Sequence, residues 1–312
     1  MFSADKKLKI IRKLKIEKYV PTRIILPIYY EHHMHRKLNL KNPKTFSEKL
    51  QWLKIYYKDP IMTKLVDKIE VREYIKKILG EEYLFPIIGI YDKFEDIDFN
   101  CLPQKFVMKC NHDSGSYVIC ANKDTFDIQN AKNKINEHLK QNYYYYWREW
   151  PYKNIKPKIL VEEYMEDISS HDCTDYKFLC FEGKVDNVLV CSERQRGVKF
   201  HYFDKQWNFK KYNYEGLRET DGFSMPKPEK FDEMIEIAEK LAGDFPCIRV
   251  DLYYINHKIY FGELTFFPNA GFNANLLDET DYIFGEKFKL KKYYYRKVMC
   301  QKRAFIKLLF IV

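Results

Sequence analysis

The most regular alternation of apolar and polar residues lies between residues 247 and 271, which read CIRVDLYYINHKIYFGELTFFPNAG. A period of two predicts two strands joined by a short turn, each with one apolar and one polar face. The polar face of the first strand carries Arg249 and Asp251, and one face of the second carries Glu263 and Thr265.

The number of residues in the turn decides whether these two faces coincide, because a one-residue slip reverses every side chain. A two-residue turn opposes Asp251 to Gly262 and separates the carboxylates. A three-residue loop at 256–258 opposes Asp251 to Glu263 instead. Opposed carboxylates repel each other, so we expect the three-residue loop with Mg²⁺ between the pair. The alternative is a solvated sheet face with ordinary charges.

The remaining apolar spacing predicts helices and short strands along the rest of the chain. Thr45 and Glu48 form a capping box ahead of one helix, and Gly80 follows another as its C′ residue. The helix after the capping box contains Leu50, Trp52, Leu53 and Ile55. The other expected helices are residues 1–40 in part, 63–79, 128–142 and 229–243. The expected strands are 83–92 (buried), 105–110, 117–120, 158–165 and a hairpin at 175–194 that turns at Glu182-Gly183.

Composition narrows the class of protein. A net charge of +10 on 312 residues favours an anionic partner: a nucleotide, an acidic polysaccharide, nucleic acid or a membrane surface. There are eight cysteines without a C-x-x-C pair, and several, including Cys101 and Cys110, lie in apolar runs, which indicates small buried side chains in a reducing compartment. Without a signal peptide or a run of about 18 apolar residues, the protein is expected to be cytoplasmic.

Both ends of the chain are basic. An apolar stripe between Leu8 and Ile16 could lie on a membrane surface, but we expect it to pack on the body of the protein. Residues 291–312 mix cations with aromatic residues and either dock at the inner face of the cytoplasmic membrane or form a packed terminal helix. The histidines at 32–35 lack the pattern of a zinc site. No recognised nucleic-acid-binding motif occurs, so nucleic acid is the less favoured partner.

Polar residues at strand ends suggest a nucleotide site. Lys109 precedes a loop of small residues whose backbone N–H groups suit phosphate oxygens, although an ordinary hairpin with an edge lysine has the same pattern. The strand that ends at Glu162 could hold adenine by backbone hydrogen bonds, with a carboxylate near the ribose. The hairpin at 175–194 places Asp175 and Lys177 on one face and delivers Arg194 and Arg196 beyond its end.

The order of these motifs resembles the ATP-grasp superfamily. The runs NPKTFSEKLQWLK, DKIEVREYIKKILGEEYLFPIIGIYD, KFVMKCNHDSGS and GELTFFPNAGF are similar to the TupA-like (teichuronopeptide-biosynthesis-type) ATP-grasp proteins of surface-polysaccharide gene clusters, over residues 40–285. The resemblance implies two α+β subdomains that clasp ATP. We therefore expect a helical N-terminal region (1–100), an ATP-grasp domain (101–290, with a small lid subdomain at 101–160 and a large one at 161–290) and a tail (291–312).

The resemblance also implies roles for individual residues. Lys109 and Lys177 would hold phosphates, Arg249 would contact phosphate or the acyl intermediate, and Arg194 or Arg196 would supply a second cation. Thr265 stands where many relatives have Asn, so its role as a ligand is open. The implied lid loop is Asn111, His112, Ser114, Gly115 and Ser116; the adenine hinge is Glu162, Glu163, Tyr164 and Met165; the metal ligands are Asp251 and Glu263, with Asp175 beside the nucleotide.

The expected activity is that of an ATP- and Mg²⁺-dependent carboxylate–amine ligase, with a sugar acid or related polysaccharide precursor and an amine as substrates. One alternative is a glycosyltransferase that uses Asp96 and Asp98, a D-x-D pattern that also arises by chance. Another is a non-catalytic module that binds a membrane or nucleic acid through the basic ends.

Overall fold

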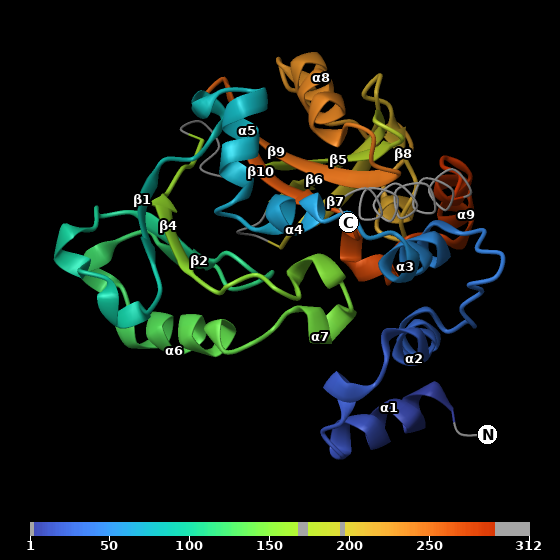
Figure 1. Ribbon diagram of the computed structural model, residues 1–312. Coiled ribbons are helices and arrows are strands. Elements are labelled where there is room, and N and C mark those ends of the chain that lie inside the picture. Colours follow the sequence, from blue (N-terminus) through green and yellow to red (C-terminus); the bar gives the residue numbers. More distant parts are fainter. Residues whose placement is uncertain (1–2, 168–173, 194–196, 291–312) are drawn as a thin grey trace, which may run out of the picture.

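The structure is a computed structural model that describes residues 3–167, 174–193 and 197–290. Figure 1 shows two lobes, each built on one antiparallel sheet, with two helices extending below the larger lobe. The helices are α1 (Ala4–Lys13), α2 (Thr22–Met34), α3 (Phe46–Tyr56), α4 (Ile61–Val66), α5 (Val71–Ile78), α6 (Ile128–Leu139), α7 (Tyr144–Trp147), α8 (Phe231–Ala242) and α9 (Asp278–Glu286). Short 3₁₀ turns include η1 (Glu17–Tyr19), η3 (Phe94–Asp96), η4 (Phe99–Cys101), η6 (Trp150–Tyr152), η7 (Gly216–Arg218) and η8 (Pro268–Gly271).

The smaller sheet has the strand order β1-β4-β2-β3, from β1 (Ile87–Tyr91), β4 (Ile159–Glu163), β2 (Phe106–Cys110) and β3 (Val118–Cys120). Alternate residues of β2, including Phe106 and Met108, pack against Ala131 and Ile135 of α6. Strand β1 lies at the sheet edge with Ile87 and Ile90 about 40% exposed, so the prediction that it is buried is wrong. Because β1 precedes residue 101, this lobe begins before the predicted domain boundary.

The larger sheet has the order β10-β9-β5-β6-β7-β8, from β10 (Lys258–Thr265), β9 (Cys247–Ile255), β5 (Asp175–Phe181), β6 (Lys184–Ser192), β7 (Lys199–Asp204) and β8 (Phe209–Lys210). One face packs on α8: Phe178 and Val250 are fully buried there, and Phe178 contacts Phe231. The opposite face of β5 and β9 carries Asp175, Lys177, Arg249 and Asp251 at one end and apolar residues such as Phe181 at the other. The predicted alternation of the 247–255 strand is thereby confirmed.

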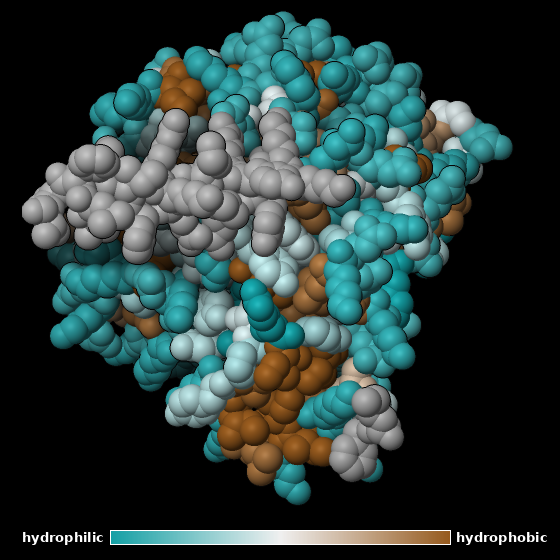
Figure 2. Space-filling view, turned by 45° about the vertical axis from the view of Figure 1, so that its right-hand side comes forward, coloured by the Kyte–Doolittle hydropathy of each residue, from teal (hydrophilic) through white to brown (hydrophobic). Residues whose placement is uncertain are grey.

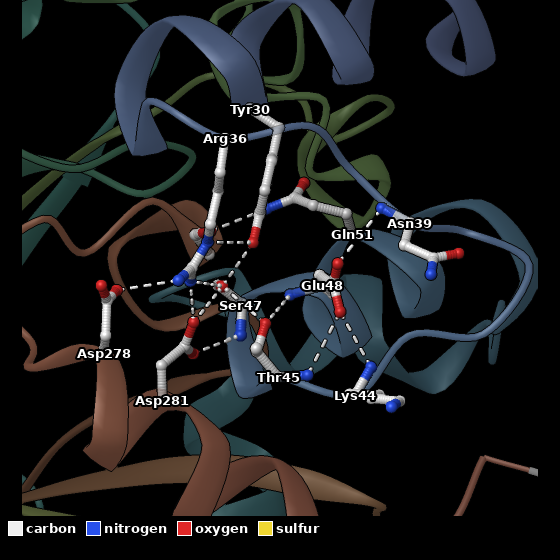
Figure 3. A network of polar contacts seen from close by, with 11 residues as sticks. Tyr30, Arg36, Asn39, Lys44, Thr45, Ser47, Glu48, Gln51, Asp278 and Asp281 are labelled. Carbon is white, nitrogen blue, oxygen red and sulfur yellow. Dashed lines mark hydrogen bonds and ion pairs between the residues drawn. The ribbon is translucent and has the colours of Figure 1, made fainter.

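A polar network attaches the N-terminal helices to the end of the large lobe (Figure 3). Asp281 of α9 accepts hydrogen bonds from the backbone N–H and the hydroxyl of Ser47, at 2.8 and 2.6 Å, and an ion pair from Arg36. Arg36 also reaches the exposed Asp278 at 2.8 Å. The predicted capping box at the start of α3 is present. These contacts bring α2, α3 and α9 together.

Two other sequence predictions change. The expected 63–79 helix is two helices, because Asp67 leaves the helical conformation and its carboxylate accepts the N–H of Ile69 at 2.8 Å. Cys101 is exposed in η4, whereas the other described cysteines are buried. Gly80 follows α5 with a positive φ, as predicted. In the described ranges, no helix has the length and apolar character needed to cross a bilayer.

Candidate active site between the two sheets

Asp251 and Glu263 are directly opposed on β9 and β10, as the metal-site hypothesis requires. The reason differs from the predicted one. The turn contains two residues, Asn256 and His257, both with positive φ, and Lys258 pairs with Ile255. The prediction of a three-residue loop is therefore wrong.

A β-bulge at Gly262 restores the register that the shorter turn would have lost. Phe261 pairs with Leu252 and Glu263 with Asp251, so Gly262 is the additional residue. A Cβ at this position would lie 3.0 Å from the backbone oxygen of Asp251, closer than ordinary side-chain contacts. Glycine thus permits the bulge that aligns the two carboxylates.

Three charged side chains lie abreast across β5, β9 and β10, because Lys177 pairs in register with Asp251 and Asp251 with Glu263. Lys177 Nζ contacts Asp251 Oδ2 at 2.5 Å and also pairs with Asp175. Arg249 binds Asp251 through Nε at 2.6 Å and Glu263 through Nη2 at 2.7 Å. The cluster thus joins three carboxylates to two cations.

Burial and the neighbouring cations shift the pKa values of Glu263 and Asp251 in opposite directions. Burial raises the pKa of Glu263, but the nearby Arg249, Lys177 and Lys68 outweigh that effect and lower its pKa to about 2. Burial also raises the pKa of Asp251, with Arg249 and Lys177 acting against it. Glu263 is consequently anionic at neutral pH, and its side chain is 42% exposed.

The donor set fits Mg²⁺ that is shared with a nucleotide. The described residues contain no group of three or more His, Cys, Asp or Glu side chains arranged to hold a metal alone. Mg²⁺ in phosphoryl-transfer sites commonly takes one or two carboxylates and completes its shell with phosphates and water. Asp251 and Glu263 match that pattern. Thr265 Oγ1 lies 3.0 Å from Glu263 Oε1 and 3.1 Å from Arg249 Nη2. The hydroxyl is therefore close to the carboxylates that would hold Mg²⁺.

The smaller sheet contributes a second ion cluster. Lys109 of β2 contacts Glu162 Oε2 at 2.5 Å, and Arg72 contacts Glu162 Oε1 at 3.2 Å. These three side chains and Glu263 line one pocket. The pocket also contains Lys68. Residues of both sheets therefore meet at a single site.

The loop after β2 is held by its own side chains. Asn111 donates to both carboxylate oxygens of Asp67 at 3.0 Å and accepts the N–H of Lys158 at 2.8 Å. Ser116 donates to Asp113 at 2.6 Å and accepts the N–H of Cys110 at 2.8 Å. His112 donates to the carbonyl of Gln141 at 3.1 Å; Ser114 and Gly115 are exposed at the tip.

Sequence reasoning missed Lys68 and Arg72, which reach the pocket from the helical segment before the small sheet. Lys68 Nζ binds the carbonyl of Asp113, and Arg72 donates to the carbonyl of Phe85 at 2.7 Å. Burial lowers the pKa of Lys68, while Glu263 and Asp113 act in the opposite direction. Lys68 and Arg72 are four residues apart in the sequence, and this spacing was the signal that could have indicated a shared site.

Glu149 is a second missed residue. It follows α7, is 4% exposed, and interacts electrostatically with Lys54, Glu263 and Arg249. Lys54 is fully buried and donates to the carbonyls of Trp147 and Ala270, both at 2.7 Å. The aromatic stretch around α7 therefore brings a buried acid toward the carboxylate cluster.

The remaining predicted residues lie as follows. Glu163 is exposed at the end of β4, and Tyr164 and Met165 are half-buried after it. The role of these residues as an adenine hinge stays a prediction. Arg194, Arg196 and the tail at 291–312 lie outside the described residues. Asp98 caps η4 by accepting the N–H of Asn100 at 2.9 Å, and it is exposed with Asp96.

Solved structures similar to this chain include D-alanine–D-alanine ligase from Helicobacter pylori, with 13% identity, a TM-score of 0.43, and coverage of 78% of this chain and 69% of that one. The D-alanine–D-alanine ligase from Bacillus anthracis in complex with ATP has 16% identity, a TM-score of 0.39, and coverage of 75% and 67%. The N5-carboxyaminoimidazole synthetase from Staphylococcus aureus in complex with ADP has 14% identity, a TM-score of 0.37, and coverage of 64% and 43%.

No curated protein matches the sequence. The sequence model of one family, TupA-like ATP-grasp, matches residues 48–289, more than three quarters of the chain. The matched range contains both ion clusters, the pocket and the bulged hairpin. This protein, an α+β chain, therefore belongs to the TupA-like ATP-grasp family.

Proposed function

We propose that the chain is an ATP- and Mg²⁺-dependent carboxylate–amine ligase that acts on a sugar acid or a related precursor of a surface polysaccharide. The observation that carries the proposal is the opposed pair of Asp251 and Glu263 beside Arg249 and Lys177. Family membership supports the reaction class, since ATP-grasp proteins are typically ATP-dependent ligases. The polysaccharide context rests on the resemblance to TupA-like proteins.

The reaction requires charge neutralisation and alignment more than covalent participation by the protein. A substrate carboxylate oxygen attacks the γ-phosphorus of ATP, the bond to the ADP oxygen breaks, and an acyl phosphate forms. An amine nitrogen then attacks the acyl carbon, inorganic phosphate leaves, and the amine loses its proton to form the amide. When bound, Mg²⁺ would be held by Asp251 and Glu263 and would supply positive charge to the phosphates.

The protein's cations have separate tasks in this proposal. Lys109 and Lys68 face the pocket from the side of the small sheet and suit the nucleotide phosphates. Arg249 and Lys177 hold the carboxylates in position and neutralise charge at the transferred phosphoryl group.

The glycosyltransferase alternative has weaker support. Asp98 is engaged in capping a 3₁₀ turn, and Asp96 lies on the exposed surface of the small lobe. A coupled ADP-release assay over uronic acids, sugar nucleotides and amines separates the two reactions. Release of ADP that depends on both a carboxylate and an amine supports the ligase, whereas sugar transfer without ATP supports the alternative.

Glu263→Gln is expected to abolish ATP turnover while leaving the fold intact. The amide keeps the size of the side chain but removes the negative charge that Mg²⁺ requires. ADP release measures turnover and circular dichroism measures the fold, with Glu236→Gln on the exposed face of α8 as the control. A Glu263→Gln rate above about a tenth of the wild-type rate would contradict the metal assignment.

A further inference from the structure

The N-terminal helices expose an unusual amount of apolar surface. Figure 2 shows a continuous apolar patch over these helices at the bottom of the molecule. The predicted apolar stripe packs only in part, because Leu8 is buried whereas other members of the stripe remain exposed. The exposed side chains are Ile10 (40%), Leu14 (59%), Ile16 (39%), Tyr19 (73%) and Ile24 (58%).

These side chains are additional to the ones that hold the helices together. Leu8 of α1 packs with Ile25, Leu26 and Tyr29 of α2 in a separate buried cluster. The exposed apolar residues lie outside that buried set, so folding alone does not account for them. Contiguous apolar patches on a surface generally mark interaction sites.

Positive charge is concentrated on the same segment. Residues 3–24 contain eight Lys and Arg but only Asp5 and Glu17 as acids, whereas residues 25–290 have a net charge of −3. The groove between α1 and α2 is also lined by more basic than acidic side chains. It is lined by Asp5, Leu8, Lys9, Arg12, His32 and His35.

Within the groove, the single acid has a hydrogen-bond partner. Asp5 pairs with His32, and this contact lowers the pKa of Asp5. Lys9 and Arg12 also line the groove, and Arg12 pairs with Glu17 at 3.7 Å, so the lining carries two basic side chains and one acid.

We propose that this face of α1, η1 and α2 docks on the surface of a bilayer that contains anionic lipids. Apolar side chains such as Ile10 and Leu14 enter the boundary of the acyl chains while the surrounding lysines meet the head groups. A second copy of the chain is a poorer occupant, because a symmetric contact would bring the two basic faces together. Such docking is confined to the bilayer surface, and none of the helices in the described part of the chain is long and apolar enough to cross a bilayer.

Vesicle flotation with the full chain tests the proposal. Phosphatidylcholine vesicles with about one third phosphatidylglycerol are expected to carry the protein, and pure phosphatidylcholine vesicles are expected to carry much less. The double substitution Ile10→Ser and Leu14→Ser is expected to reduce the partition coefficient by about tenfold or more. The matched control, Ile128→Ser and Leu217→Ser, removes two similarly exposed apolar residues from α6 and η7 and should retain wild-type binding.

Circular dichroism establishes that both double variants fold, which is expected because all four residues are exposed. Equal flotation of the wild type and the Ile10→Ser, Leu14→Ser variant would overturn the proposal. So would a wild-type dimer in light scattering that becomes monomeric in this variant, because a second copy would then cover the patch. Binding that is insensitive to anionic lipid would also contradict it.

Discussion

Arg249 and Lys177 give the carboxylate cluster its stability before any ligand arrives. Each cation contacts two acidic side chains, so Asp251 is enclosed from both sides. Removing one partner of such a buried set leaves an uncompensated charge and generally destabilises a protein strongly. Substitutions of Arg249 or Lys177 consequently mix effects on folding with effects on activity, whereas Glu263, with its partly exposed side chain, reports on activity more directly.

Glu149 predicts a pH dependence of stability. Burial raises its pKa from the ordinary 4.5 to about 7, although Lys54 opposes the shift. The folded protein therefore binds a proton that the unfolded chain has released between these two values, so stability is lost as pH rises from about 4.5 to about 7. Glu149→Gln should remove this decline in stability. Urea unfolding at several pH values between about 5 and 7 measures the change.

Glu236→Gln on exposed α8 is the control for that experiment and should keep the wild-type pH profile. A wild-type profile in the Glu149→Gln variant would contradict the assignment. Above pH 7 Lys54 dominates. Burial lowers its pKa from 10.5 to about 7, so the unfolded chain holds a proton that the folded protein has lost, and stability should rise with pH.

At the scale of elements, α9 is joined to α2 and α3 through Asp281. This carboxylate is 2% exposed and accepts from Ser47 as well as Arg36. Asp281→Ala is expected to lower the free energy of unfolding by about 3 kcal/mol, because Arg36 and Ser47 lose a buried partner. Urea denaturation measures the change.

The matched control is Asp278→Ala. Asp278 pairs with the same Arg36 but is 82% exposed, so its removal should change stability by less than about 1 kcal/mol. Equal losses in the two variants would mean that the network does not hold the elements together as described.

The β9–β10 hairpin shows how far sequence patterns predict structure. Alternation predicted both strands and their polar faces, because side-chain direction in a strand is a local property. The turn was assigned one residue too many, since two routes produce the same pairing of Asp251 with Glu263. A glycine within a strand often marks a bulge, and Gly262 was the local sign of the correct route.

Contacts between distant segments could not be read in the same way. Lys109 and the loop after it were predicted from neighbouring residues. Arg72, which shares Glu162 with Lys109, and Lys68, which binds the carbonyl of Asp113, come from another part of the chain. The burial of Glu149 depends on packing around α7, which has no periodic signature. The fold class and the opposed positions of Asp251 and Glu263 were therefore accessible from sequence, whereas Lys68, Arg72 and the buried Glu149 were not.

At the scale of the whole molecule, Lys68 links the segment before the small sheet with the loop after β2 and the pocket. Lys68→Met is expected to weaken the binding of MgADP by about tenfold, because a cation that faces the phosphates is lost. Isothermal titration calorimetry measures the dissociation constant, which avoids the need for the other substrates.

Lys64→Met is the control, since Lys64 is exposed one turn earlier on α4. It should bind MgADP like the wild type. If Lys68→Met also binds like the wild type, the role of Lys68 is confined to its contact with the carbonyl of Asp113.

The bonds within the loop after β2 have a consequence for the motion of the protein. Asn111, Asp113 and Ser116 are at most 3% exposed and are tied to neighbouring segments. Ordering the backbone of one residue costs roughly 1–2 kcal/mol in conformational entropy. In this loop the cost is met when the protein folds, before a nucleotide binds. Closure over a nucleotide can then proceed by rotation of one lobe as a rigid body, with the loop carried along. Its amide hydrogens should exchange slowly even in the empty protein.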